Sequence, residues 1–309
     1  MKLIRPVLCL TCFFIVANTL CFAQKPIIVV VKSADISPYN SALEGFKKII
    51  KNRKPKLINF NVKNKDLIKQ INENNPEMVL TIGTAATRVI KQNVKDIPVV
   101  FCMVLSPVEN DFIRSTLSSG NNLTGVQLDI PVESKFKTLK TILPEIKDIG
   151  LIYTVKENRN LVSKGEYAAK KLGLNLRKLS IENVKQFPKA FEELIKSIDA
   201  FWMIANTSVY TSETVQEILL RAIRNKVPVI GLSPPYVKAG ALFSLSCDYE
   251  DIGKQAGEIG MKVLSGNAPG NIPISSPRKE IISLNLIVAE RIGIEIPEKV
   301  INKAENIYK

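Results

Sequence analysis

Short apolar runs alternate with amphipathic stretches along almost the whole chain, and this alternation constrains the fold more than any other feature. Residues 26–31 (PIIVVV) are continuously apolar, which is typical of a strand buried on both faces of a parallel sheet. Strand and helix patterns then follow one another with short connections, which predicts a doubly wound parallel sheet. The alternation pauses in a polar connector at residues 105–122 and then resumes. The sequence therefore predicts an α/β chain with two Rossmann-like lobes.

Apolar periodicity predicts short strands and longer helices along the chain. Strands are expected at residues 26–31, 57–62, 78–82, 97–103, 123–128, 149–153, 174–179, 200–204, 227–230, 241–246 and 280–284. Helices are expected at residues 39–50, 65–74, 85–92, 132–142, 158–171, 184–197, 213–224 and 248–265, with a short one ending at Gly293. The length of 309 residues is sufficient for two lobes of ordinary size.

The first 23 residues have the order of a signal peptide, with a basic start (MKLIR), an apolar run and a small residue at Ala23. We expect cleavage between Ala23 and Gln24, which makes the mature protein an exported one. Two alternatives keep it at the membrane. The apolar run stays as an N-terminal anchor, or Cys21 carries a lipid, although Leu20 before it is poor for lipid processing. No later stretch is long and apolar enough to span a membrane.

The chain contains no histidine. This excludes Ser-His-Asp and Cys-His catalysis, histidine metal sites and a histidine pH switch. No phosphate-binding G-x-x-x-x-G-K-[ST] loop and no metal-ligand spacing occurs either. We therefore expect no enzyme activity, no metal and no cofactor.

The formal charge is +14, and removal of Lys2 and Arg5 with the leader leaves 41 basic against 29 acidic residues, or +12. The basic residues are mostly lysines scattered over predicted helices, without an arginine-rich arm. This pattern favours a solvated surface over nucleic-acid binding. Attraction to anionic lipid or to an acidic partner remains open. Cys102 and Cys247 lie in or at the end of apolar strands, so buried free thiols are expected, although an exported protein allows a disulfide.

Residues 241–266 contain the most distinctive pattern, a short strand followed by a glycine-containing helix. Asp248 is expected to cap this helix, and Gly266 is expected to end it. Gly253, Gly257 and Gly260 lie on nearby turns of one helix, at a cost of ~1 kcal/mol each against alanine. We therefore expect this helix to pack very closely on a neighbour.

The pattern Y-x-K-x-G-A-L at residues 236–242, followed by D-Y-x-x-I-G-x-Q-A-G at residues 248–257, closely resembles the tryptophan/phenylalanine-type family of ABC-transporter substrate-binding proteins. Further blocks similar to the family occur in order along the chain. They are VLTIGTAA (79–86), IPVVF (97–101), NLTGV (122–126), LPEIKDIGLIY (143–153) and GIEIPEKV (293–300).

The resemblance implies the type I periplasmic-binding-protein fold, with two lobes that close on a hinge around a small-molecule ligand. It implies a periplasmic or other extracytoplasmic monomer that delivers its ligand to an ABC permease without chemical change. The expected parts are a signal peptide at 1–23, a first lobe at 24–122 plus about 248–272, and a second lobe at 123–247 plus about 273–309. Asp248 would lie near the hinge beside the cleft, as a ligand contact, a helix cap or both.

Ligands bind beyond the carboxyl ends of strands in open parallel sheets, where helix N–H groups also accept anions. This rule selects Ser33, Asp35, Thr84, Ala85 and Ser106 in the first lobe, and Thr154, Asn206, Thr207 and Ser233 in the second. Gln127 is a further uncharged hydrogen-bonding residue at an expected cleft position. Tyr236 and Tyr249 are candidates for flanking an apolar ligand, whereas Trp202 is expected in the core.

Several of these residues have a purely structural alternative. Thr84 could simply cap the next helix, and Ser106-Pro107 could be an ordinary turn. Asp35 could pair with a ligand ammonium group or be a solvated loop acid.

The chain departs from the family pattern in the expected cleft, with Asn206-Thr207 in place of a common Asp-Asn pair and Thr154-Val155 in place of Asn-Pro. The resemblance therefore leaves the ligand open. A ligand sensor that docks on a receptor or sensor kinase is the alternative function. A repressor effector domain would need a DNA-binding headpiece where this chain has its leader.

Overall fold

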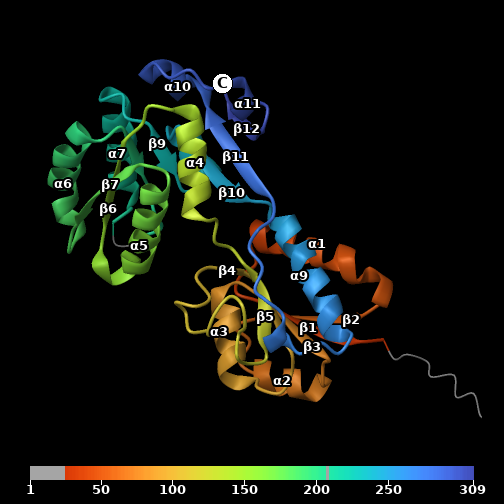
Figure 1. Ribbon diagram of the computed structural model, residues 1–309. Coiled ribbons are helices and arrows are strands. Elements are labelled where there is room, and N and C mark those ends of the chain that lie inside the picture. Colours follow the sequence, from red (N-terminus) through yellow and green to blue (C-terminus); the bar gives the residue numbers. More distant parts are fainter. Residues whose placement is uncertain (1–24, 207–208) are drawn as a thin grey trace, which may run out of the picture.

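The computed structural model describes residues 25–206 and 209–309 and contains two lobes, each built on one β-sheet with helices on both faces (Figure 1). The strands of the first sheet are β1 (Ile27–Lys32), β2 (Lys56–Asn61), β3 (Met78–Ile82), β4 (Val99–Val104) and β5 (Leu123–Gln127). They lie in the order β2-β1-β3-β4-β5, and all pair in parallel.

Helices cover both faces of the first sheet because its strands are apolar on both sides. They are α1 (Ser37–Ile50), α2 (Leu67–Asn74), α3 (Thr84–Asn93) and α9 (Tyr249–Leu264). Val30 packs with α1 and α9 on one face, and Val29 and Val31 pack with α2 and α3 on the other. A short 3-10 turn, η1 (Lys51–Arg53), follows α1.

The second sheet has seven strands in the order β12-β11-β10-β9-β8-β6-β7. The strands are β6 (Asp148–Tyr153), β7 (Asn175–Ser180), β8 (Ala200–Trp202), β9 (Val229–Gly231), β10 (Phe243–Cys247), β11 (Glu280–Asn285) and β12 (Ala304–Tyr308). The helices are α4 (Val132–Ile142), α5 (Val155–Lys171), α6 (Phe187–Leu194), α7 (Ser212–Arg224), α8 (Pro234–Ala239), α10 (Leu286–Ile292) and α11 (Glu298–Ile301). Its two faces carry separate apolar cores, one with α4, α5, α10 and α11 and the other with α6, α7 and α8. The predicted α/β class with two doubly wound lobes is confirmed.

Three details of the sheets differ from the sequence prediction. Strand β5 pairs with β4 in the first sheet, although residue 123 was expected to begin the second lobe. The polar connector before β5 returns to the same sheet, and Leu123 and Val126 fill the cores of the first lobe. Strand β11 is antiparallel to β10, and β12 was not predicted because its residues are only half-buried and show no apolar run.

The helices α1 and α9 pack as closely as the glycine pattern predicted. A Cβ added at Gly253 would lie 1.8 Å from the carbonyl oxygen of Ala42, and one added at Gly45 would lie 1.9 Å from that of Glu250. Only glycine permits this approach of the two backbones. Asp248 caps α9 as expected, since its side chain accepts a hydrogen bond from the N–H of Asp251 at 3.0 Å.

We place three crossings between the lobes, at residues 128–131, at residues 247–248 and at residues 276–279. They run side by side (Figure 1). Gln127 N–H donates to Ser275 O at 2.9 Å, and Asp248 N–H donates to Lys279 O at 3.3 Å. Cys247 is buried at this point, with its Sγ 3.5 Å from Leu128 O. Within the described residues, no helix is both long and apolar enough to cross a membrane.

Candidate functional site

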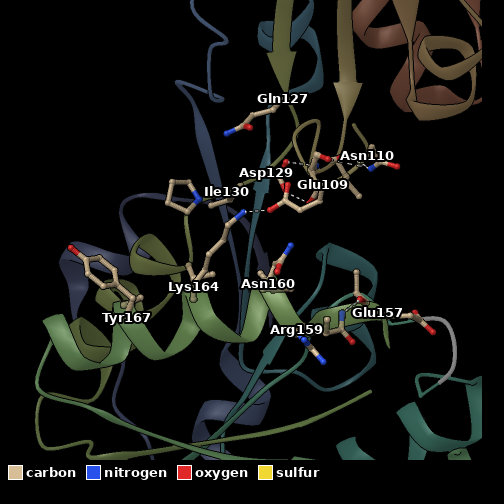
Figure 2. Close-up of a pocket in the computed structure, with 18 of the residues that line it drawn as sticks. Glu109, Asn110, Gln127, Asp129, Ile130, Glu157, Arg159, Asn160, Lys164 and Tyr167 are labelled. Carbon is tan, nitrogen blue, oxygen red and sulfur yellow. Dashed lines mark hydrogen bonds and ion pairs between the residues drawn. The ribbon is translucent and has the colours of Figure 1, made fainter. Parts of the chain in front are cut away.

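A cavity of about 960 Å³ lies between the lobes, at the carboxyl ends of the strands (Figure 2). The first lobe contributes Gln127 at the end of β5 and the segments that follow β4 and β5, including Ser106, Glu109 and Asp129. The second lobe contributes the first turns of α5, residues 155–161, and further residues along that helix. The cavity is therefore bounded by residues of both lobes, which are built on different sheets.

Asp129 lies on the first-lobe side of the cavity and is held by Ser106. The backbone N–H of Ser106 donates to Asp129 Oδ2 at 2.7 Å, and the hydroxyl of Ser106 lies 3.4 Å from Oδ1. Burial raises the pKa of the Asp129 carboxyl above its ordinary value, although the hydrogen bonds from Ser106 oppose this shift. The carboxylate is thus fixed in position and poorly hydrated, so a cationic group in the cavity would be a favourable partner for it.

An ion pair joins the two sides of the cavity. Lys164 on α5 donates from Nζ to Glu109 Oε1 at 2.7 Å, as Figure 2 shows. Partial burial acts to raise the pKa of Glu109, but the hydrogen bond and charge of Lys164 outweigh it, so the pKa is lowered. The first lobe therefore presents carboxylates to the cavity, and the second presents the cations Lys156, Arg159 and Lys164 together with the carboxylates Glu133 and Glu157.

The loop after β8 is held against the start of α5 by buried amides. Asn206 Nδ2 donates to Thr154 Oγ1 at 2.9 Å and also to Asn158 Oδ1. Asn206 Oδ1 accepts from Val209 N–H at 2.8 Å, and Asn158 Nδ2 donates to Ala205 O at 2.9 Å. Thr154 and Asn206 are thus buried behind the wall of the cavity, whereas Asn158 and Ala205 line it.

The start of α3 forms a second polar feature at the cleft edge of the first sheet. Gly83 is its N-cap at φ +94°, and a Cβ there would lie 2.6 Å from the hydroxyl of Tyr39 and 2.7 Å from that of Ser33. Ser33 Oγ accepts from Ala86 N–H at 2.8 Å. No described residue accepts a hydrogen bond from the N–H of Thr84 or Ala85. The cap of this helix is therefore Gly83 and not Thr84. The N–H groups of Thr84 and Ala85 remain available to a ligand.

The cavity brings together only some of the residues selected from the sequence. Ser106 and Gln127 line it, and Gln127 also donates from Nε2 to Ser276 Oγ at 2.9 Å. The remaining residues do not line it. Ser33, Thr84, Ala85 and Ser233 lie at carboxyl ends of other strands, and Asp248 lies at the hinge, 2.9 Å from Lys279 Nζ. Thr207 lies outside the described residues.

Asp35 is exposed and pairs with Lys32 at 2.9 Å. The hydrogen bond from Lys32 is the main cause that lowers the pKa of this carboxyl. Tyr236 and Tyr249 pack against apolar cores and do not line the cavity. Trp202 is a core residue as expected, since its ring lies 5.1 Å from that of Phe136 in an edge-to-face contact.

Several cavity residues were missed at the level of sequence, namely Glu109, Asn110, Asp129, Asn158, Arg159, Asn160, Lys164 and Tyr167. Asp129 and Glu109 could have been found, because both follow strands of the first sheet closely. Lys164 and Tyr167 lie in the middle of α5 and look like solvent-facing residues of an amphipathic helix. Within the described parts of the chain, no group of three or more acidic or cysteine side chains could hold a metal ion.

Comparison with known proteins gives two curated relatives. The chain is 27% identical to a tyrosine-binding protein from Clostridioides difficile over 212 residues, which is 68% of this chain but only 61% of that protein. It is 24% identical to an uncharacterized protein from Rickettsia prowazekii over 228 residues, which is 71% of this chain and 68% of that protein.

Solved structures share the fold. The ligand-free, open structure of a substrate binding protein with adhesive properties from Clostridium difficile has a TM-score of 0.79 at 22% sequence identity. The match covers 92% of this chain and 98% of that protein's chain. An ABC domain from Streptococcus pneumonia in complex with L-Trp has a TM-score of 0.67 at 21% sequence identity. The match covers 92% of this chain and 100% of that domain's chain. A family model for ABC transporter substrate binding proteins matches residues 28–308, nearly the whole chain, and the protein therefore belongs to that family.

Proposed function

We propose that this protein is an extracytoplasmic solute-binding protein that takes up an α-amino acid between its lobes and delivers it to an ABC permease. The observation that carries the proposal is the cavity itself. It is bounded by two separate sheets and presents Glu109 and Asp129 on one side and Lys164 on the other. A zwitterion has the complementary pair of charges.

The ends of an amino acid would find different partners. An ammonium group suits the half-buried carboxylate of Asp129, which is held by hydrogen bonds from Ser106. A carboxylate suits Lys164, which lines the cavity, or the N–H groups of Thr84 and Ala85, which lie outside it at the carboxyl end of β3. Exposed apolar side chains at the cavity, Leu105 and Val155, would contact an apolar side chain of the ligand.

The relatives support this ligand class, because one is a tyrosine-binding protein and one solved structure contains L-Trp. The fold of this protein is shared with both the open, ligand-free structure and the L-Trp complex. In the proposed mechanism, the ligand favours the closed arrangement by contacting both lobes at once, and a permease recognises that arrangement.

The first test is a thermal-shift screen of residues 24–309 with amino acids, nucleosides, sugars and small anions. A ligand that binds only the folded state adds ~2.7 kcal/mol to its stability at ~100 times the dissociation constant. We expect shifts from amino acids and none from sugars or nucleosides. A strong shift from a sugar or nucleoside, with none from any amino acid, would refute the ligand class.

The charged ends of the ligand are tested by calorimetry with matched compounds. For a hit such as tyrosine, we expect tyrosinamide, which lacks the carboxylate, and 3-(4-hydroxyphenyl)propionate, which lacks the ammonium group, each to bind at least ~tenfold more weakly, because each loses a charge-assisted hydrogen bond. Delivery is tested separately in proteoliposomes, where ligand-loaded protein should stimulate the ATPase activity of the cognate permease. Stimulation of a sensor kinase in place of the permease would support the sensing alternative.

A further inference from the structure

The end of the first lobe that lies away from the cleft carries a concentrated positive charge. Residues 45–65 contain eight lysines and arginines and no acidic residue. This segment forms the last turns of α1, η1 and the edge strand β2. We propose that this end of the lobe binds the anionic headgroups of a phospholipid membrane.

The basic end, as we name this surface, consists of six exposed side chains: Lys25, Lys51, Arg53, Lys54, Lys56 and Lys262. They come from three parts of the chain that backbone and side-chain contacts hold together. Lys56 N–H donates to Pro26 O at 2.9 Å, which joins the starts of β2 and β1. Arg53 Nη2 donates to Ser265 Oγ at 2.9 Å, which joins η1 to the end of α9 beside Lys262.

None of these six side chains forms an ion pair with a described residue, whereas their neighbours Lys47 and Lys48 pair with Glu44 and Glu250. The acidic residue Glu77 lies beside the start of β1, where its N–H donates to Ile27 O. Six positive charges and this one negative charge leave the surface at +5. Cations that have no acidic partner among the described residues are free to pair with phosphate groups outside the protein.

The position of the basic end suits a membrane more than a soluble anion. It lies at the amino ends of β1 and β2, whereas the cleft lies at the carboxyl ends of the strands. Helix α9 runs from the hinge to this surface over 16 residues, or ~24 Å, so docking leaves the cleft unobstructed. Lys25 of this surface also follows closely after the apolar run of residues 6–23 in the sequence.

The test is co-sedimentation of the protein comprising residues 24–309 with phosphatidylcholine vesicles that contain or lack phosphatidylglycerol. Each basic residue near an anionic surface strengthens binding roughly fivefold, so we expect binding only to vesicles with phosphatidylglycerol and loss of binding in high salt. Binding that is absent, or equal on both kinds of vesicle, would overturn the proposal.

A matched pair of variants locates the surface. Lys51→Glu, Lys54→Glu and Lys56→Glu together should weaken binding at least ~tenfold. Lys170→Glu, Lys185→Glu and Lys189→Glu change the net charge equally, but on exposed parts of the second lobe, and should have little effect. An equal loss in both variants would show that only net charge matters and would refute the docking surface. Reduced amide hydrogen exchange at residues 51–56 on vesicles tests the unmodified protein independently.

Discussion

Lys164 of the second lobe pairs with Glu109 of the first, with 2.7 Å between Nζ and Oε1. Each lobe supplies one partner, so a rotation of one lobe against the other changes this contact directly. The pair is also partly exposed, with 58% of the Lys164 side chain and 26% of the Glu109 side chain accessible to solvent. Its contribution to folding is therefore small, and its effect on closure is the quantity of interest.

The first prediction follows from this pair. Lys164→Gln should change the free energy of unfolding by less than ~1 kcal/mol, because the pair is hydrated. It should weaken ligand binding at least ~tenfold, because closure excludes water and strengthens the same pair. Calorimetric titration and thermal unfolding check the two effects. Lys178→Gln, which breaks the pair of Lys178 with Glu166 within the second lobe, is the control and should leave affinity unchanged.

The second prediction concerns Asp129, whose pKa is raised by burial from its ordinary value of 3.8. A raised pKa means that ionisation of this carboxyl costs more free energy in the folded state than in the unfolded state. Its contribution to stability is therefore greatest below 3.8 and falls as the pH rises through the raised value. Asp129→Asn has no carboxyl to ionise and should lose this dependence of stability on pH. As the pH rises from 3.8, the melting temperature of the variant should therefore rise relative to that of the wild type. A difference that does not vary with pH would contradict it.

The third prediction tests the close approach of α1 and α9. Gly253→Ala places a methyl group where only 1.8 Å separates it from Ala42 O, so the helices must move apart. We expect a loss of about 3 kcal/mol in the free energy of unfolding, measured by urea denaturation. Lys262→Ala on the exposed side of α9 should cost less than about 0.5 kcal/mol. Equal effects of the two substitutions would show that the helices tolerate separation.

The fourth prediction tests the start of α3 as part of the ligand site. Thr84→Trp fills the cleft edge beside the available N–H groups of Thr84 and Ala85, so it should abolish ligand binding while the melting temperature changes little. Gln92→Trp, at the exposed far end of the same helix, should retain full affinity. Unchanged affinity in the Thr84 variant would show that ligand does not reach this edge of the sheet.

Much of the fold could be predicted because it depends on apolar periodicity and on glycine. The buried run at Val29, Val30 and Val31 predicted a strand with helices on both faces, and Gly253 predicted a close helix contact. The side of the hinge on which β5 lies could not be predicted, because a parallel strand looks the same in either sheet. Strand β12 could not be predicted either, since its half-buried residues carry no strong pattern.

The site was only partly predictable for a different reason. The rule of carboxyl strand ends led to Ser106, which lines the cavity, as does Gln127, which was selected as an uncharged hydrogen-bonding residue at an expected cleft position. It also selected Thr154 and Asn206, whose polar groups bind each other behind the wall. Lys164 could not be found in this way. It looks like any lysine on the exposed face of an amphipathic helix, and the sequence does not show that the other lobe faces this helix.

The order in which the parts of the first lobe occur in the chain has a consequence for biosynthesis. Helix α9 covers the apolar face of α1, yet more than 180 residues and most of the second lobe separate them along the chain. A ribosome therefore releases residues 27–127 long before the helix that completes their core has been made. The first lobe must wait, incompletely buried, for residues 249–264.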